Sequence, residues 1–363
     1  MNENKSRGVF FESGELFAAS NSARGFKSYY DRIFDRERLL HLYIIKGGPG
    51  TGKSSFMKKV GEHLERRGVA VEYYRCSFDP DSIDGILTDT GIAFIDGTAP
   101  HPAECEISGA RDELIDLGAF WYAPALRERY DEISELSLGK RKAYEIAYGY
   151  LGACGEIIKI EKSSVLSALR QDKMLAAVSR LLPREVRGGG FDLIPSLTDS
   201  FGMRGRVSLD TYERHADTVY EIKDLFSSGS FFLSALIERA KQCEIPVRVS
   251  YDPIMPEYPN AVFLCNSKTA FVLRASTDAG SEGAKSINME RFLDKSLCDL
   301  QKARRKRNKR LLGELMSEAR EELVRAGKYH FALERLYVAS MDFTAKEAFT
   351  DSFCKMLDER YFN

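Results

Sequence analysis

The chain has 363 residues with 53 basic and 54 acidic side chains. This length favours two or more domains, and the charge balance gives no global field for binding nucleic acid or a membrane. Its seven cysteines form no C-x-x-C pair, no apolar run reaches the roughly 18 residues of a membrane span, and the first residues carry no signal-type segment, so we predict a cytoplasmic protein with reduced thiols.

The first half alternates between strand-like and helix-like segments. A strand-like stretch at residues 16–20 and a short helix at 28–34 precede an apolar strand at 42–45. A helical pattern at 56–65 and strands at 69–76 and 92–95 follow. This alternation predicts an α/β domain with a parallel sheet. From about residue 124 to 182 the sequence is long, charged and helical, and we expect an arm packed on or beside that sheet.

Residues 47–54 read G-G-P-G-T-G-K-S and complete the P-loop pattern G-x-x-x-x-G-K-[ST] between a strand and a helix. In such a loop the glycines turn N–H groups inward, and the following helix adds its positive N-terminal end to the anion site. Lys53 is expected to reach the β- and γ-phosphates and Ser54 to ligate Mg²⁺. The predicted nucleotide-binding residues are Gly47, Gly48, Pro49, Gly50, Thr51, Gly52, Lys53, Ser54 and Ser55.

Asp96 closes the apolar run I-A-F-I-D, at the strand end where open α/β sheets bind ligands. We therefore predict Asp96 as the acidic Mg²⁺ partner, catalytic together with Lys53. Residue 97 is Gly, so the usual place of a water-activating glutamate is empty and the general base stays open. His101 and Glu104 are candidates, whereas Asp79 in S-F-D-P is interpreted as a turn residue because S-Y-D-P recurs at 250–253.

The second half repeats the first. Ile45 and Ile222 are 177 residues apart, as are Phe94 and Phe271, and I-D-L at 115–117 matches I-N-M at 287–289 with an offset of 172. Equivalent strands are expected at 193–197, 219–222, 247–251 and 270–273, a short helix at 209–216, and a second helical arm from about 291 to 362. An internal repeat of roughly 180 residues is the preferred organisation.

This repeat predicts two tandem P-loop-type domains, at residues 1–182 and 191–363, joined by a linker at about 183–190. At the constant offset the second loop reads D-L-F-S-S-G-S-F, with Ser230 for Lys53, Phe231 for Ser54 and Leu273 for Asp96. Without a lysine, a metal ligand or an acid, the second copy is expected not to bind nucleotide.

Residues 302–310 read K-A-R-R-K-R-N-K-R, with seven basic residues in nine. Such a block binds nucleic acid or another polyanion in many proteins. The competing interpretation is a solvated helical arm that pairs with acidic neighbours, and it is preferred because aromatic residues are not interleaved.

The P-loop, the segments I-D-G-T-A-P-H at 95–101 and D-L-G-A-F-W at 116–121, and the repeat resemble a poorly characterised bacterial family of P-loop ATPases and ATP-binding proteins of about this length. The resemblance covers nearly the whole chain. It implies ATP binding at residues 47–54 with Asp96 as the acidic partner.

Three functions remain open at this point. A Mg²⁺-dependent ATPase is preferred, with ATP and Mg²⁺ as cofactors. A P-loop phosphotransferase would close its arm over a small acceptor, with Arg127, Arg129 and Arg141 as contributors. A nucleic-acid-associated ATPase would use residues 302–310. Self-association into a homo-oligomer also stays open.

Overall fold

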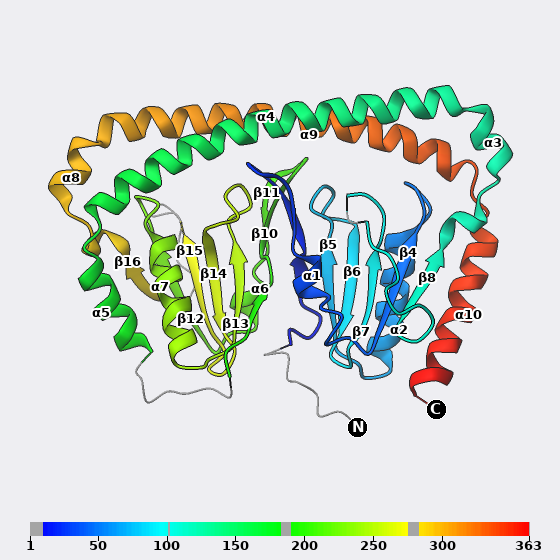
Figure 1. Ribbon diagram of the computed structural model, residues 1–363, viewed down its shortest axis with the longest axis horizontal. Helices are drawn as coiled ribbons and strands as arrows, with labels where there is room; N and C mark the ends of the chain where they lie inside the picture. Colours follow the sequence, from blue (N-terminus) through cyan, green and yellow to red (C-terminus); the bar gives the residue numbers. More distant parts are fainter. Residues whose placement is uncertain (1–9, 101, 183–189, 275–282, 363) are drawn as a thin grey trace.

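The computed structural model describes residues 10–100, 102–182, 190–274 and 283–362. Two α/β units stand side by side beneath a layer of two long antiparallel helices (Figure 1). None of the described helices is both long and apolar enough to cross a membrane.

The first unit is a six-stranded mixed sheet. Its strand order is β1 (Glu15–Phe17), β5 (Val71–Arg75), β6 (Ile83–Thr88), β7 (Ile92–Asp96), β4 (His41–Lys46) and β8 (Asp112–Asp116). Only β6 runs against its neighbours in this sheet. The prediction of a parallel sheet therefore holds for the other five strands and is wrong for β6. A short turn, closed by the Cys76 N–H donating to the Ser82 carbonyl at 2.9 Å, joins β5 to β6, and a connection this short permits only antiparallel pairing.

The second unit repeats this topology strand for strand. Its order, from the inner edge, is β9 (Leu193–Pro195), β13 (Val247–Tyr251), β14 (Pro259–Leu264), β15 (Thr269–Arg274), β12 (Thr218–Lys223) and β16 (Lys285–Asn288). The register agrees as well, since Ile45 pairs with Asp96 in the first sheet and Ile222 pairs with Leu273 in the second. The positions matched along the sequence at these strands are thus equivalent in space.

Short elements complete each unit. In the first they are β2 (Ala19–Ser22), β3 (Gly25–Ser28), α1 (Tyr30–Ile33), α2 (Lys53–Arg66) and η1 (Leu117–Phe120). In the second they are β10 (Asp199–Gly202), β11 (Gly205–Ser208), α6 (Thr211–Arg214), α7 (Gly229–Gln242) and η2 (Met289–Phe292). The hairpins β2–β3 and β10–β11 meet between the units, where the Asn21 amide donates to the Phe201 carbonyl at 2.7 Å.

A buried ion pair joins the two sheets. Arg248 on β13 binds both carboxylate oxygens of Glu72 on β5, and the two side chains are 4% and 1% exposed. Glu72 also accepts from the Phe11 N–H and the Tyr74 hydroxyl. Since Val71 pairs with Thr88 and Val247 with Leu264, Glu72 and Arg248 occupy equivalent positions of the repeat. At the same position of the repeat, the first half thus carries a carboxylate and the second a guanidinium, and the two groups pair across the contact between the halves.

The helical arms cross over. The first comprises α3 (Ala123–Glu128), α4 (Tyr130–Ala168) and α5 (Gln171–Leu181), and the second α8 (Lys295–Leu300), α9 (Lys302–Val338) and α10 (Phe343–Tyr361). Met174 and Val178 of α5 pack in the core of the second unit. Phe353 and Leu357 of α10 pack in the core of the first. Each arm therefore ends on the opposite sheet (Figure 1), not on or beside its own as expected.

The length of the arms explains this exchange. At 1.5 Å per residue, the 39-residue α4 is about 58 Å long, enough to pass over both sheets without a break. Buried side chains of α4 and α9, among them Leu151 and Leu323, share a core cluster with Phe201 and Met255 beneath them. The predicted linker falls largely outside the described residues, because 183–189 are not among them.

Candidate functional site

The P-loop of the first half joins β4 to α2 at the carboxyl edge of its sheet. Gly47, Gly50 and Gly52 have φ values of 143°, 72° and 79°, a region that favours glycine. A Cβ atom at Gly50 would lie 2.8 Å from Val338 and 2.9 Å from the Glu334 carbonyl. Helix α9 of the other half therefore packs directly on this loop.

Lys53 and Asp96, both predicted from the sequence, lie together beside the loop. The Lys53 ammonium is 3.6 Å from the Asp96 carboxylate and donates to the carbonyls of Gly47 and Gly48 at 2.8 and 3.0 Å. Asp96 also accepts from the Thr98 N–H at 2.8 Å. Burial raises the pKa of Asp96, with Lys53 acting in the opposite direction.

Sequence reasoning missed Asp84, which precedes Gly85 at the start of β6. Because Gly85 pairs with Ile95 in an antiparallel register, the next position places Asp84 opposite Asp96, where side chains share one face of the sheet. The Asp84 carboxylate contributes to the raised pKa of Asp96, after burial and against Lys53. The missed signal was the polar residue of I-D-G just after the β5–β6 turn, hidden because β6 itself was not predicted.

These oxygens suit a magnesium ion. The Ser54 hydroxyl accepts the Ile83 N–H at 3.0 Å, which places it at the start of β6, one residue before Asp84. A hydroxyl and two carboxylates thus come from adjacent elements, and such hard oxygen ligands are the ones Mg²⁺ prefers. The donor set fits the predicted metal ligands Ser54 and Asp96, and Asp84 lies beside Asp96 as a second carboxylate.

The other candidate bases stand differently. Glu104 binds Lys46 at 2.8 Å through a largely exposed carboxylate, so it is engaged away from Lys53. His101 lies outside the described residues. Asp79 is in the β5–β6 turn, where its carbonyl accepts the Ser82 N–H. Asp252 of S-Y-D-P is not its equivalent in the repeat, because Asp252 directly follows β13 whereas Asp79 lies four residues beyond β5.

The crossing helices cover the site. Tyr337 on α9 lies 3.3 Å from where the Cβ of Gly48 would be, and Trp121, which follows η1, lies 3.2 Å from it. Burial, together with the charges of Lys140 and Lys53, lowers the pKa of His330 on α9 to about 4. Burial also lowers the pKa of Lys140 on α4, and the charge of Lys53 acts in the same direction. Helices α9 and α4 thus bring the neutral imidazole of His330 and the ammonium of Lys140 near Lys53.

Lys346 of α10 was not singled out from the sequence. Its side chain is 1% exposed, and its ammonium hydrogen-bonds to the Ser55 hydroxyl at 3.1 Å and to Glu347 at 2.8 Å. A Cβ at Gly52 would lie 3.3 Å from that ammonium. The second arm thus contributes a buried cation beside the first turn of α2.

The loop of the second half is one residue shorter than that of the first, so the constant offset of 177 does not hold across it. Buried residues of α2 such as Phe56 and Leu64 match Phe232 and Ala240 of α7 at an offset of 176. Gly229 therefore replaces Lys53, and Ser230, not Phe231, replaces Ser54. Leu273 does stand at the position of Asp96. The lysine and the acid are lost, while the hydroxyl is kept.

An internal carboxylate fills the second loop. Asp224 accepts N–H bonds from Phe226, Ser228 and Gly229 at 3.2, 2.9 and 2.7 Å, the kind of donors that bind phosphate at a helix N-terminus. Lys162, which α4 brings from the first half, donates to the Ser230 hydroxyl and to the Ser227 carbonyl. A triphosphate would have to displace a carboxylate that this loop already holds.

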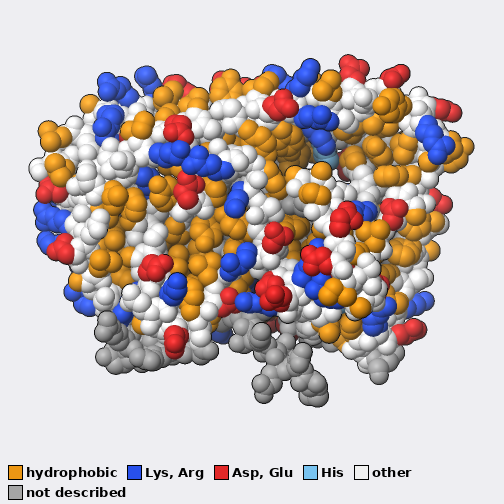
Figure 2. Space-filling model, in the orientation of Figure 1, with side chains coloured by type: hydrophobic (Ala, Val, Ile, Leu, Met, Phe, Trp, Pro, Cys, Tyr) orange, Lys and Arg blue, Asp and Glu red, His pale blue; other side chains and the backbone are white. Residues whose placement is uncertain are grey.

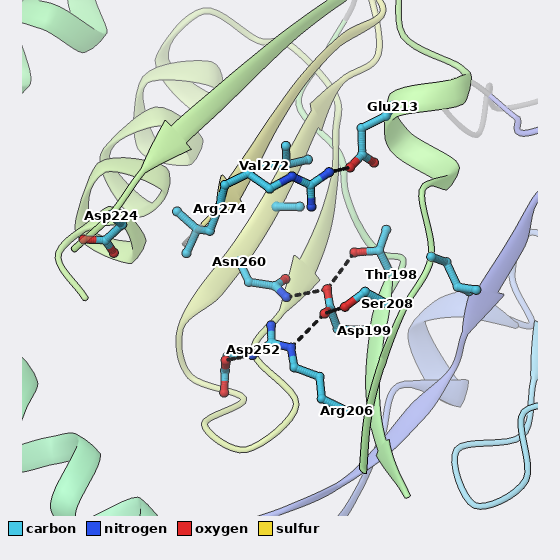
Figure 3. A pocket seen from close by; sticks show the side chains of 13 residues that line it. Thr198, Asp199, Arg206, Ser208, Glu213, Asp224, Asp252, Asn260, Val272 and Arg274 are labelled. Atoms are coloured by element: carbon cyan, nitrogen blue, oxygen red, sulfur yellow. Dashed lines mark hydrogen bonds and ion pairs between the residues drawn. The ribbon is translucent and has the colours of Figure 1, made fainter. Parts of the chain in front are cut away.

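A polar cavity of about 400 Å³ lies at this edge of the second sheet (Figure 3). Asn260 stands there in place of Asp84 and donates to Asp199 at 2.7 Å. Arg206 binds Asp199 and Asp252, and Arg274 binds Glu213. With Asp224, four carboxylates line the cavity against two guanidinium groups, both already paired. The excess of negative charge opposes phosphate binding.

The basic block forms the start of α9. Arg304 donates to Ser164, and Arg305 lies 3.5 Å from Glu161 and 4.2 Å above the ring of Phe226. Two of the seven basic residues therefore anchor α9 to α4 and to the second loop. On the face seen in Figure 2, basic side chains along the upper edge alternate with acidic and apolar ones. The ion pairs Arg305–Glu161 and Arg310–Glu314 fit the interpretation of an arm that pairs with acidic neighbours.

The seven cysteines are free thiols. No group of three or more His, Cys, Asp or Glu residues that could hold a metal occurs within the described ranges. Comparison of the chain with protein-family models, with curated proteins and with solved structures finds no match.

Proposed function

We propose that the chain binds ATP with Mg²⁺ at the P-loop of its first half and hydrolyses it, and that the second half is a copy without nucleotide. The observation that carries this proposal is the meeting of Lys53, Asp96 and Asp84 beside the glycine-rich loop at the start of α2. That combination supplies a phosphate cradle, a compact cation and hard metal ligands at one sheet edge.

Each residue has a distinct role in the proposal. The N–H groups of the loop and Lys53 hold the phosphates, so that Lys53 moves from the Gly47 and Gly48 carbonyls to the γ-phosphate. Ser54 and Asp96 hold the metal. Asp84, close to Asp96 and outside the loop, is placed to orient the attacking water. Water-positioning groups of this kind are the recurring last component of P-loop hydrolysis.

Hydrolysis is preferred to transfer onto an acceptor. The three arginines expected in a lid are exposed: Arg127 lies on α3, Arg129 between α3 and α4, and Arg141 on α4. Helix α9 instead contacts the loop at Gly48 and Gly50. This close cover leaves water as the acceptor that fits most easily. Activation by nucleic acid is not proposed, because Arg304 and Arg305 are engaged within the chain.

Replacing Asp96 by asparagine tests the assignment. The Asp96→Asn variant keeps the shape and removes one metal-binding charge, so turnover should fall by at least about 100-fold while Mg²⁺-independent nucleotide affinity changes little. Steady-state phosphate release measures the first quantity and titration in EDTA measures the second.

The matched control is Asp116→Asn. Asp116 ends β8, on the other side of β4, and accepts the Gly118 N–H at 2.8 Å at the start of η1. Asn288 accepts the Glu290 N–H at the start of η2 in the same way. This variant should hydrolyse ATP at the wild-type rate. Wild-type turnover by Asp96→Asn would remove Asp96 from the metal site.

A further inference from the structure

Lys346 is buried where its charge has little compensation. Among the described residues its ammonium bonds to Ser55 and Glu347, which uses two of its three donors. Glu347 also binds Lys59 at 3.0 Å and is half exposed. Two ammonium groups thus share one carboxylate, and a buried cation without a full partner is destabilising.

The surroundings of Lys346 are positive as well. Ser55 lies in the first turn of α2, and the N-terminus of a helix carries a partial positive charge that repels a cation. Lys53 begins the same turn. This concentration of positive charge on one loop suits a bound polyanion.

The second unit shows which side chain occupies the position of Lys346 when no ammonium is present. Buried residues Ala147 and Leu151 of α4 match Ala319 and Leu323 of α9 at an offset of 172, and Val178 of α5 matches Thr350 of α10 at the same offset. Met174 is then the equivalent of Lys346, and it is 4% exposed in the core of the second unit. The packing therefore accepts a methionine, so that space filling alone does not require the lysine.

Resting on the proposed function, we propose that Lys346 binds the phosphates of the nucleotide at the Ser55 side of the cradle, opposite the end served by Lys53. The nucleotide site is then composite, because the C-terminal arm supplies one of its cations. A bound nucleotide would tie α10 to α2, and through α10 it would tie the second arm to the first sheet.

Lys346→Met and Lys59→Met separate this role from a structural one. Both changes remove an ammonium from the α2–α10 contact, but only Lys346 lies at the loop, since Lys59 pairs with Glu347 and Asp351 nearer the surface. Affinity of the full-length chain for a non-hydrolysable ATP analogue and for ADP, both with Mg²⁺, is measured by calorimetry. Lys346→Met should bind both about 10- to 100-fold more weakly, and Lys59→Met should bind within about twofold of wild type.

Thermal melting without nucleotide gives the second readout. Replacing a buried charge by an apolar side chain of similar volume should leave the melting temperature of Lys346→Met unchanged or higher. Wild-type affinity in Lys346→Met, or an equal loss in both variants, would overturn the role of Lys346 and leave the proposed function standing. A wild-type chain that binds neither nucleotide would overturn both.

Discussion

Changing Lys53 to alanine should reduce Mg·ATP affinity by at least about 100-fold. Lys53 is the cation whose ammonium already lies against the loop carbonyls and 3.6 Å from Asp96. Hydrogen bonds to charged groups contribute about 1.5–3 kcal/mol each, and the β- and γ-phosphates would each lose one such bond from Lys53. Equilibrium titration with a fluorescent ATP analogue measures the loss.

Lys58→Ala is the control for that change. Lys58 is exposed on the same helix, five residues further along, and donates to the Asp81 carbonyl. It should bind nucleotide as the wild type does. Equal affinity of the Lys53→Ala and wild-type chains would remove residues 47–55 as the nucleotide site.

Changing Glu72 to leucine should lower the free energy of unfolding by about 3–5 kcal/mol, because the buried Arg248 would lose the carboxylate that balances its charge. Urea unfolding followed by the fluorescence of the single tryptophan, Trp121, reports the change. The double variant Glu72→Leu, Arg248→Met restores a neutral interface and should recover most of the loss. A Glu72→Leu chain as stable as the wild type would show that the pair does not hold the two halves together.

The positions of the candidate site residues could be anticipated from the sequence. The P-loop spacing predicted Lys53 and Ser54, and the acidic end of an apolar strand predicted Asp96, because each signal is local in the chain. The pairing of β4 with β7 places the loop before Lys53 next to Asp96, and the two side chains meet there. The change from strand to helical arm was visible as a change of periodicity and charge.

Features that depend on the third dimension could not be read in this way. Strand β6 has the buried pattern of any core strand, so neither its direction nor the meeting of Asp84 with Asp96 was visible. The one-residue deletion in the second loop was hidden, since Gly229 matched Gly52 by chance at the wrong offset. Only the buried positions of α7 reveal the true register.

The crossing of the arms is the clearest such case. A helix with apolar residues on one face must pack on a sheet, but its sequence does not say which of two similar sheets receives it. The choice followed from length, because α4 and α9 extend past their own units before α5 and α10 begin. Lys346 and Lys162 therefore reach the loops of the opposite halves, as no local pattern could indicate.

The stoichiometry of nucleotide binding tests the central claim most directly. Calorimetric titration of the full-length chain with a non-hydrolysable ATP analogue and Mg²⁺ should give one site, which Lys53→Ala removes, because Asp224 fills the second loop and Leu273 replaces its acid. Two sites per chain, with the second surviving Lys53→Ala, would contradict the account.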